Sequence, residues 1–214
     1  MKKYIILSFD DNTIEDRIVV SLLNKYGLHG TFHINSGTIG TKNHIDYSEL
    51  RTLYNNHEIS SHTMTHPNLP DLQKNDILRE IGHDMKTLSK YSKNEVRGMS
   101  YPFGNYNENV LNCLKELGVM YARTVDDTFN FQNPENFLIW NPTAHYNKVI
   151  ENDLLNNFIK DKNAKIMYIW THSWEFNSDD SWRTFEEFLK QIYCEDNIIS
   201  ITSIDYYLQE KAKH

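Results

Sequence analysis

Four side chains that can bind a metal ion fall into two short stretches of the sequence. Asp10 and Asp11 end an apolar run that begins at Tyr4, and His62 and His66 are separated by three residues. A short apolar run bounded by charge is typical of a buried strand. Two histidines at this spacing can share one face of a helical turn and so share a metal ion. With one carboxylate they would make a recurrent three-ligand site, formed by Asp11, His62 and His66.

This interpretation makes a demand on the backbone at the two aspartates. Side chains alternate between the faces of a regular strand, so Asp10 and Asp11 cannot both point at one centre from it. The strand must therefore end within the pair, and the chain must turn at Asn12. Ordinary explanations stay open at this point, because aspartates also cap helices and ten histidines allow a chance spacing. Pro67 excludes a long helix through His66.

Two further stretches place turn-forming or polar residues directly after an apolar strand. Pro102, Phe103 and Gly104 would form a tight loop whose backbone N–H groups can face a ligand. An ordinary strand-to-helix turn has the same composition. His172 follows the very apolar run 165–171, and a single histidine there is open to either a structural or a functional interpretation.

Strand and helix patterns alternate along nearly the whole chain. Strands are expected at 4–10, 30–35, 58–61, 97–101, 119–125, 165–171 and 198–202, and helices at 14–26, 47–55, 74–91, 107–117, 151–160, 182–193 and 204–209. Between them, 126–147 is expected to be irregular. This alternation implies parallel strands joined by helical crossovers. We therefore predict an α/β fold, a distorted (β/α)7-type barrel with parallel strands, complete or incomplete, in one catalytic domain over residues 1–214.

Composition restricts the partners and the compartment. The formal net charge of -7 argues against nucleic acid or an acidic membrane surface as a partner, since both need a basic patch. Cys113 and Cys194 are far apart, which argues against a disulfide framework. The first apolar run is too short for a signal peptide, and no stretch approaches a membrane span. We expect a cytoplasmic protein, and the sequence implies no protein partner.

Taken in order, these stretches resemble the motifs of the polysaccharide deacetylase family, also called carbohydrate esterase family four, with its nodulation-type deacetylase domain. The matching segments are 8–11, 61–67, 101–104 and 170–172. These enzymes remove acetyl groups from N-acetylated or O-acetylated sugars, and their fold is a distorted β/α barrel. The resemblance extends from residue 4 to about residue 205.

The resemblance implies a role for each matching residue. Asp10 would be the general base, and Asp11 with the two histidines would hold a divalent metal. Zinc is the common ion, with cobalt, nickel or manganese as alternatives. The backbone N–H of Phe103 would bind the oxyanion, and His172 would be the general acid.

The sequence departs from the family pattern in three places. The last motif is only partly matched, because His172 is followed by Ser-Trp-Glu-Phe. Ser100 stands where the family usually has an arginine that orients the base; Arg123 is our preferred substitute, ahead of Arg97. The family's Asp-x-x-Asp-Trp motif, which tunes the acid, is not matched cleanly, and its nearest counterparts are Asp126, Asp127 and Trp140.

Aromatic and polar residues near the strand ends are candidates for contact with a sugar. They are Tyr101, Trp140, Trp174 and His145. Core packing is the ordinary alternative for each.

We therefore expect a metal-dependent hydrolase of carbon–nitrogen bonds that removes acetyl groups, N-acetyl in preference to O-acetyl, from an acetylated amino sugar or its polymer. One alternative is a weak or inactive sugar-binding protein of the same fold. Another is an amide hydrolase of this fold that acts on a non-sugar substrate, with or without metal. An Fe(II) oxygenase also uses two histidines and one carboxylate, but usually on a β sandwich.

Overall fold

The strands of the computed structural model, which describes residues 2–213, pair in parallel throughout. They are β1 (Lys3–Asp10), β2 (Gly30–Ile34), β3 (Glu58–Ser61), β4 (Gly98–Ser100), β5 (Tyr121–Arg123), β6 (Ala144–His145), β7 (Ile166–His172) and β8 (Ile198–Ser200). Their order across the sheet is β5-β4-β3-β2-β1-β7-β6, and β8 pairs with the beginning of β1. β1 is therefore the central strand of the fold.

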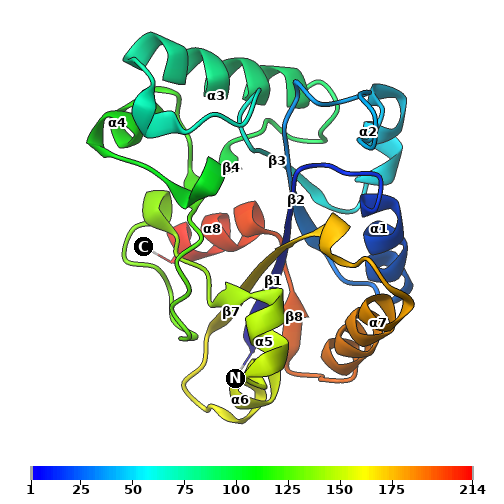
Figure 1. Cartoon of the computed structure of the whole chain (residues 1–214). Helices are drawn as coiled ribbons and strands as arrows, with labels where there is room; N and C mark the ends of the chain where they lie inside the picture. Colours follow the sequence, from blue (N-terminus) through cyan, green and yellow to red (C-terminus); the bar gives the residue numbers. More distant parts are fainter. Residues whose placement is uncertain (1, 214) are drawn as a thin grey trace.

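Helices connect the strands and surround them (Figure 1). They are α1 (Asp16–Lys25), α2 (Tyr47–Leu53), α3 (Lys74–Leu88), α4 (Glu108–Glu116), α5 (Tyr146–Glu151), α6 (Leu154–Lys160), α7 (Asp179–Tyr193) and α8 (Ser203–Lys211). None of the helices within residues 2–213 is both long enough and apolar enough to cross a membrane.

The sheet curls, and one segment brings its two edges together. Trp140 makes a parallel bridge to Arg123 of β5, and Ala144 pairs with Ile169 of β7 a few residues later. The result is a curled half-barrel of parallel strands with helical crossovers. The predicted distorted β/α barrel is confirmed.

The secondary structure predicted from the sequence was wrong between residues 126 and 160. The segment expected to be irregular, 126–147, contains β6 and the first two residues of α5. The single helix expected at 151–160 covers the last residue of α5 and all of α6. The break lies at Asp153, whose φ of +50° interrupts the helical backbone. A two-residue strand carries too little periodicity to be found from sequence.

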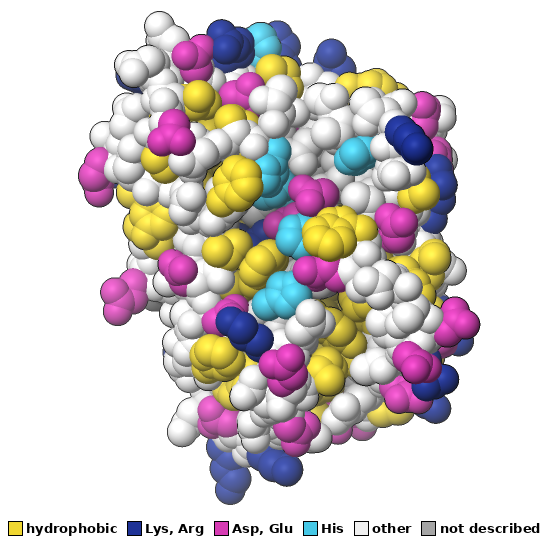
Figure 2. Space-filling view, in the orientation of Figure 1, with side chains coloured by type: hydrophobic (Ala, Val, Ile, Leu, Met, Phe, Trp, Pro, Cys, Tyr) yellow, Lys and Arg dark blue, Asp and Glu magenta, His cyan; other side chains and the backbone are white. Residues whose placement is uncertain are grey.

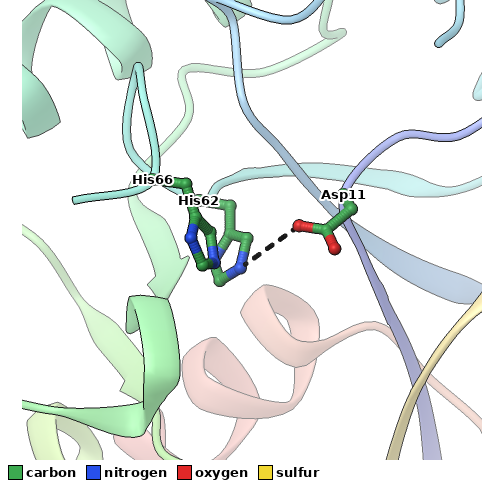
Figure 3. A group of neighbouring side chains, drawn as sticks. All are labelled: Asp11, His62 and His66. Carbon is green, nitrogen blue, oxygen red and sulfur yellow. Dashed lines mark ion pairs between the residues drawn. The ribbon is translucent and has the colours of Figure 1, made fainter. Parts of the chain in front are cut away.

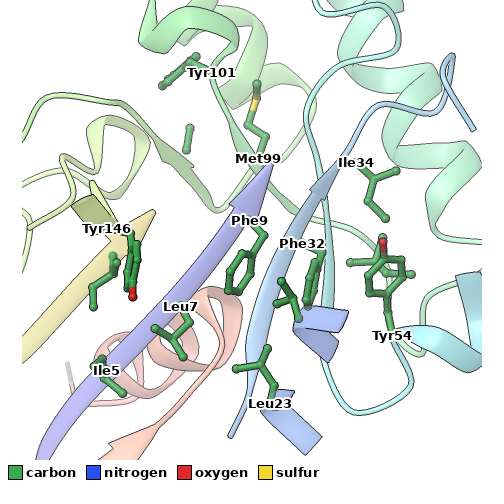
Figure 4. Packing of buried hydrophobic residues seen from close by; sticks show 14 of the residues in the cluster. Ile5, Leu7, Phe9, Leu23, Phe32, Ile34, Tyr54, Met99, Tyr101 and Tyr146 are labelled. Carbon is green, nitrogen blue, oxygen red and sulfur yellow. The ribbon is translucent and has the colours of Figure 1, made fainter. Parts of the chain in front are cut away.

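The central strand has two faces of different character. Ile5, Leu7 and Phe9 face the helices and pack with core residues such as Leu23 and Phe32 (Figure 4). The inward-facing set comprises Ile6, Ser8 and Asp10. Each large apolar side chain buried on the helix side stabilises the fold by roughly 1.5–3 kcal/mol. A slip of one residue would place Asp10 among these apolar side chains, so burial determines the register and directs Asp10 inward.

Helix α8 closes one end of the curled sheet. Its first N–H groups bond to strand residues, with Ser203 N donating to Thr31 Oγ1 (2.9 Å) and Ile204 N to Glu58 Oε2 (3.0 Å). Tyr206 packs there with Trp140 in an aromatic cluster. Because α8 fills this end, the carboxyl ends of the strands are the open end at which a ligand can bind.

The charge on Glu58 makes the stability of this closed end depend on pH. Burial raises the pKa of Glu58 to about 7, against hydrogen bonds from Ile204, Tyr121 and Thr31. Between the ordinary pKa of 4.5 and about 7 the folded protein binds more protons than the unfolded chain, so stability falls as pH rises. From pH 5 to pH 8 we expect the wild type to lose about 1–3 kcal/mol more unfolding free energy than Glu58→Gln.

Urea unfolding of both proteins at the two pH values measures this difference. Glu187→Gln, at an exposed site on α7, is the matched control and should follow the wild type. Equal losses in Glu58→Gln and the wild type would show that Glu58 does not carry the effect.

Candidate active site

The chain turns between the two aspartates, as strand alternation required. β1 ends at Asp10, and Asp11 and Asn12 follow with φ of +79° and +42°. The Asn12 side chain holds this turn because its Oδ1 accepts a hydrogen bond from Asn35 N (2.9 Å). The backbone carbonyl of Asn12 accepts a second hydrogen bond from Ile45 N (3.0 Å). Both carboxylates therefore approach His62, whose Nε2 lies 3.9 Å from Asp10 Oδ2 and 3.7 Å from Asp11 Oδ1.

His62 is oriented by the residue that replaces the family's arginine. Its Nδ1 lies 3.0 Å from the carbonyl oxygen of Ser100 and 2.6 Å from Ser100 Oγ. A proton on Nδ1 satisfies the carbonyl and leaves the Nε2 lone pair facing Asp11. Burial lowers the pKa of His62, so the neutral imidazole that a metal requires is favoured.

The loop 63–66 carries the second histidine in a constrained conformation. Thr63 and His66 both have positive φ, +67° and +57°. His66 N donates to Thr63 Oγ1 (3.1 Å), and the next segment is tied to α3 because Thr65 N donates to Glu80 Oε2 (2.8 Å). The ring of His66 consequently lies beside that of His62, and Asp11 faces both from the end of β1 (Figure 3).

Two buried acids that support this loop were missed by sequence reasoning. Glu80 holds Thr65, and Asp84 accepts hydrogen bonds from Ser36 N (2.7 Å) and Ser61 Oγ (2.5 Å). Burial raises the pKa of Asp84 to about 6, against those hydrogen bonds. Both acids fall on the apolar stripe of α3, and acids on an apolar helix face were the signal available in the sequence.

The donor atoms of Asp11, His62 and His66 lie within 4.8 Å of one another. Two imidazoles and one carboxylate are a donor set suited to zinc and related divalent ions. The Asp11 side chain is 28% exposed, whereas His62 is buried, so the group is enclosed on one side and open on the other. On the surface, histidine and acidic side chains gather around a hollow near the centre of this face (Figure 2). The residues fit a divalent metal that keeps an open position.

Asp10 forms a buried ion pair with Arg123. Both side chains are almost completely buried, and Arg123 also donates to Thr124 O (2.8 Å) and stacks on Trp170 (4.9 Å to the ring centre). Burial opposes ionisation of Asp10, but Arg123, followed by His62, outweighs burial and holds its pKa well below the usual range. Arg97, the other candidate partner, instead pairs with Glu95 at the surface.

His172 ends β7 next to the end of β1. The register pairs Asp10 with His172, whose Nε2 lies 3.7 Å from Asp11 Oδ2 and whose Nδ1 lies 3.5 Å from Glu175 Oε1. Burial lowers the pKa of His172, but Glu175, Asp10 and Asp11 outweigh burial and raise it. Glu175 was missed because its partner lies on the same short turn, which has no periodic signal.

Asp126 and Asp127, the nearest counterparts of the family motif that tunes the acid, form no ion pair with His172 among the described residues. Asp127 accepts the backbone N–H of His145 and pairs with Lys148, and Asp126 is exposed. Glu175 takes the position beside His172 because the 3-10 turn after β7 brings it back towards the strand end.

Two of the residues expected to contact a sugar, Tyr101 and Trp140, are buried, so that prediction was wrong. Tyr101 and Trp140 are each 1% exposed; Tyr101 donates its hydroxyl to Leu138 O, and Trp140 lies in the aromatic cluster beneath α8. Neither presents a ring face to a ligand. Trp174, 48% exposed, packs beside His172, and His145 pairs with Glu175.

Phe103 lies next to the histidine pair. Its φ is +58° and its ring contacts His66, with 4.7 Å between ring centres. The side chain is 60% exposed. The role of its backbone N–H stays a prediction.

Comparison with known proteins shows the family of this chain. The family model described as polysaccharide deacetylase matches residues 1–122. The chain belongs to the polysaccharide deacetylase family. It is 26% identical over 156 residues to the poly-beta-1,6-N-acetyl-D-glucosamine N-deacetylase of Staphylococcus aureus, covering 64% of this chain and 53% of that protein. The chain spans about half the length of the curated relatives it matches.

Solved structures of this family share the fold. The peptidoglycan deacetylase PdaC of Bacillus subtilis superposes with a TM-score of 0.65 at 16% identity, covering 99% of this chain and 93% of that one. A family 4 carbohydrate esterase from Streptomyces lividans, in complex with acetate, gives a TM-score of 0.65 at 16% identity, with 92% and 91% covered. At these identities the likeness concerns the fold alone.

The buried ion pair makes a testable demand on stability. Arg123→Met leaves the Asp10 carboxylate buried without its partner, which should lower the unfolding free energy by about 3–5 kcal/mol. Asp10→Asn combined with Arg123→Met removes both charges and should recover a large part of that loss. Urea unfolding of metal-free protein measures both effects. A double variant no more stable than Arg123→Met would show that the loss comes from packing and not from charge.

Proposed function

We propose that this chain is a metal-dependent deacetylase that hydrolyses the N-acetyl group of an acetylated amino sugar or its polymer. One observation carries the proposal. A candidate metal-binding group of Asp11, His62 and His66 lies beside an arginine-paired Asp10 and a strand-end His172, in a chain of a deacetylase family.

A divalent ion, zinc in the first place, would be held by Asp11, His62 and His66. When bound it would supply polarisation of the acetyl carbonyl and acidification of a water molecule, the two things that amide hydrolysis at neutral pH lacks. The chain's own contribution there is orientation, because Ser100 directs the His62 ring and the Glu80 contact holds the His66 loop.

Asp10 is proposed to accept the proton of the attacking water. Arg123 binds its Oδ2, so Oδ1, with Ser100 Oγ 3.4 Å away, is the oxygen left for that proton. The ion pair keeps Asp10 ionised and fixed, but it also makes Asp10 a weak base. Proton transfer to it therefore depends on a water that is already acidified.

His172 is proposed to protonate the leaving amine. The strand register sets it beside Asp10, and the neighbouring acids favour its protonated form. An amine leaves an sp³ centre readily only after protonation, and an imidazolium can supply that proton near neutral pH. The backbone N–H of Phe103 is proposed as an oxyanion donor, a contribution of roughly 3 kcal/mol when such a group is well placed.

The substrate class is part of the proposal. Trp174 offers an exposed ring beside His172 on which a sugar can stack, with His145 close to His172. The name of the Staphylococcus aureus relative specifies an N-acetylglucosamine polymer, which supports an N-acetylated amino sugar here.

The alternatives are weaker on specific grounds. The replacement of the family's arginine by Ser100 favoured an inactive sugar-binding protein, but Arg123 supplies an ion pair to Asp10 from β5. An Fe(II) oxygenase is disfavoured because the sheet is parallel and crossed over by helices. An amide hydrolase acting on a non-sugar substrate would differ from the proposed deacetylase only in the molecule that binds beside Trp174.

Acetate release tests the reaction. Incubation of zinc-loaded protein with N-acetylglucosamine oligomers should release acetate, and removal of the metal by a chelator should abolish release, which zinc then restores. The measurement is enzymatic quantification of acetate across mono- and oligosaccharides with N- or O-acetyl groups. Chelator-insensitive release would support a metal-independent amide hydrolase. A total absence of acetate with every sugar would reject the proposed function.

The role of Asp10 can be separated from metal binding. Asp10→Asn should slow acetate release by about 100-fold or more, the range expected for loss of a general base. Its zinc content, measured by plasma mass spectrometry, should stay at the wild-type level because Asp11 is intact. Asp180→Asn, at a site 81% exposed, is the matched control and should retain activity. An unchanged rate in Asp10→Asn would remove Asp10 as the base.

A further inference from the structure

A second group of metal-ligand side chains lies beside the first. Donor atoms of His145, His172 and Glu175 also lie within 4.8 Å of one another, although neither His145 nor Glu175 is part of the proposed catalytic set. We propose that these three residues form a second site for a zinc-type divalent cation, separate from the site at Asp11.

The distances suit coordination with little movement. His145 Nε2 lies 2.9 Å from Glu175 Oε2, and His172 Nδ1 lies 3.5 Å from Glu175 Oε1. A tetrahedral zinc ion with bonds of about 2.1 Å separates its ligand atoms by roughly 3.4 Å. Two imidazoles and one glutamate are also the protein ligands of a recurrent open zinc site.

Two of the donor atoms have unused bonding capacity. Glu175 Oε2 accepts hydrogen bonds from Thr171 Oγ1 (2.6 Å) and His172 N (3.2 Å), whereas Oε1 faces the His172 ring and accepts no hydrogen bond from the residues that the structure describes. Within residues 2–213, His172 Nδ1 is buried and has no hydrogen-bond partner. A cation between His172 Nδ1 and Glu175 Oε1, which lie 3.5 Å apart, would bond to both atoms.

His145 must change its tautomer before its Nε2 can bind the second cation. At present its Nδ1 accepts a long hydrogen bond from Asn147 N (3.3 Å), which places the ring proton on Nε2 towards Glu175. Ligation through Nε2 requires the proton on Nδ1 and opening of that contact. The long helix-cap contact is lost, and the hydrogen bond between His145 Nε2 and Glu175 Oε2 is exchanged for bonds to the cation, while the His145 backbone remains paired in β6.

The two rings are held in place, and the site is open to solvent. His145 packs edge-on against Trp170 (4.7 Å between ring centres), and His172 packs against Trp174 (5.0 Å). The side chains of His145, His172 and Glu175 are 15%, 21% and 23% exposed. Rings fixed by packing reduce the ordering needed for ligation, and partial exposure provides a path for the ion.

The second site has a consequence for catalysis, which rests on the proposed function. His172 lies between the two groups, with Nδ1 towards Glu175 and Nε2 towards Asp11. An ion held by Nδ1 would engage the imidazole proposed to serve the leaving amine. The second cation should therefore inhibit, and acetate release should pass through a maximum near one zinc ion per chain.

Equilibrium dialysis of metal-free protein against Zn²⁺, with zinc quantified by plasma mass spectrometry, tests the site directly. Wild type should bind two ions per chain. His145→Asn, which keeps a helix-capping side chain, and Glu175→Gln should each bind one. In both variants the dissociation constant of the second zinc ion should rise by more than about 100-fold, because loss of even an outer-shell contact lowers metal affinity roughly 10- to 100-fold. His83→Gln, at an exposed site on α3, is the control for surface histidines and should bind two.

Each outcome decides between the assignments. One zinc ion per wild-type chain, or two ions retained in both His145→Asn and Glu175→Gln, would overturn the second site. Either variant suffices if the other does not fold, as judged by circular dichroism. Two ions without any acetate release would reject the proposed function and leave the second site standing. If the protein releases acetate with one ion bound, and excess zinc neither binds nor inhibits, the second site would be rejected and the proposed function would stand.

Discussion

The buried ion pair between Asp10 and Arg123 is the interaction on which the rest of the site depends. The two residues come from β1 and β5, which are separated by three strands in the sheet. They meet only because the sheet curls and both side chains face its concave side. A buried charge without its partner costs several kcal/mol, so the curl of the sheet and the pairing of these charges support each other.

The loops around this pair adopt backbone conformations that few side chains favour. Asp11, His66 and Phe103 all have positive φ, in three different loops at the same end of the sheet. Such conformations persist where the surroundings over-determine them. Here the restraint comes from buried polar groups, among them Asn12 in the first loop and Glu80 beneath the second. Polar residues inside the fold thus position the site without entering it.

The two ring nitrogens of His172 face different acidic side chains. Asp11 approaches one ring nitrogen and Glu175 the other, so the proposed proton transfer and the proposed second cation site share one imidazole. Glu175 also receives hydrogen bonds from the hydroxyl and backbone around it, which fixes its position. The strand-end histidine is therefore oriented by a residue three positions away and not by a distant acidic motif.

The sequence by itself determined what periodicity and strand ends can determine: the β/α alternation, the strand that ends at Asp10, the turn that follows and the grouping of Asp11 with two histidines. Which arginine meets Asp10, which acid faces His172 and which aromatic rings are buried were decided by the tertiary structure. Arg123 was a preference among two candidates; Glu175 was missed, and Tyr101 and Trp140 were placed wrongly. The physical reason is that alternation assigns a side chain to a face of its own strand, whereas contacts across the concave side depend on the curl and register of strands far apart in the chain.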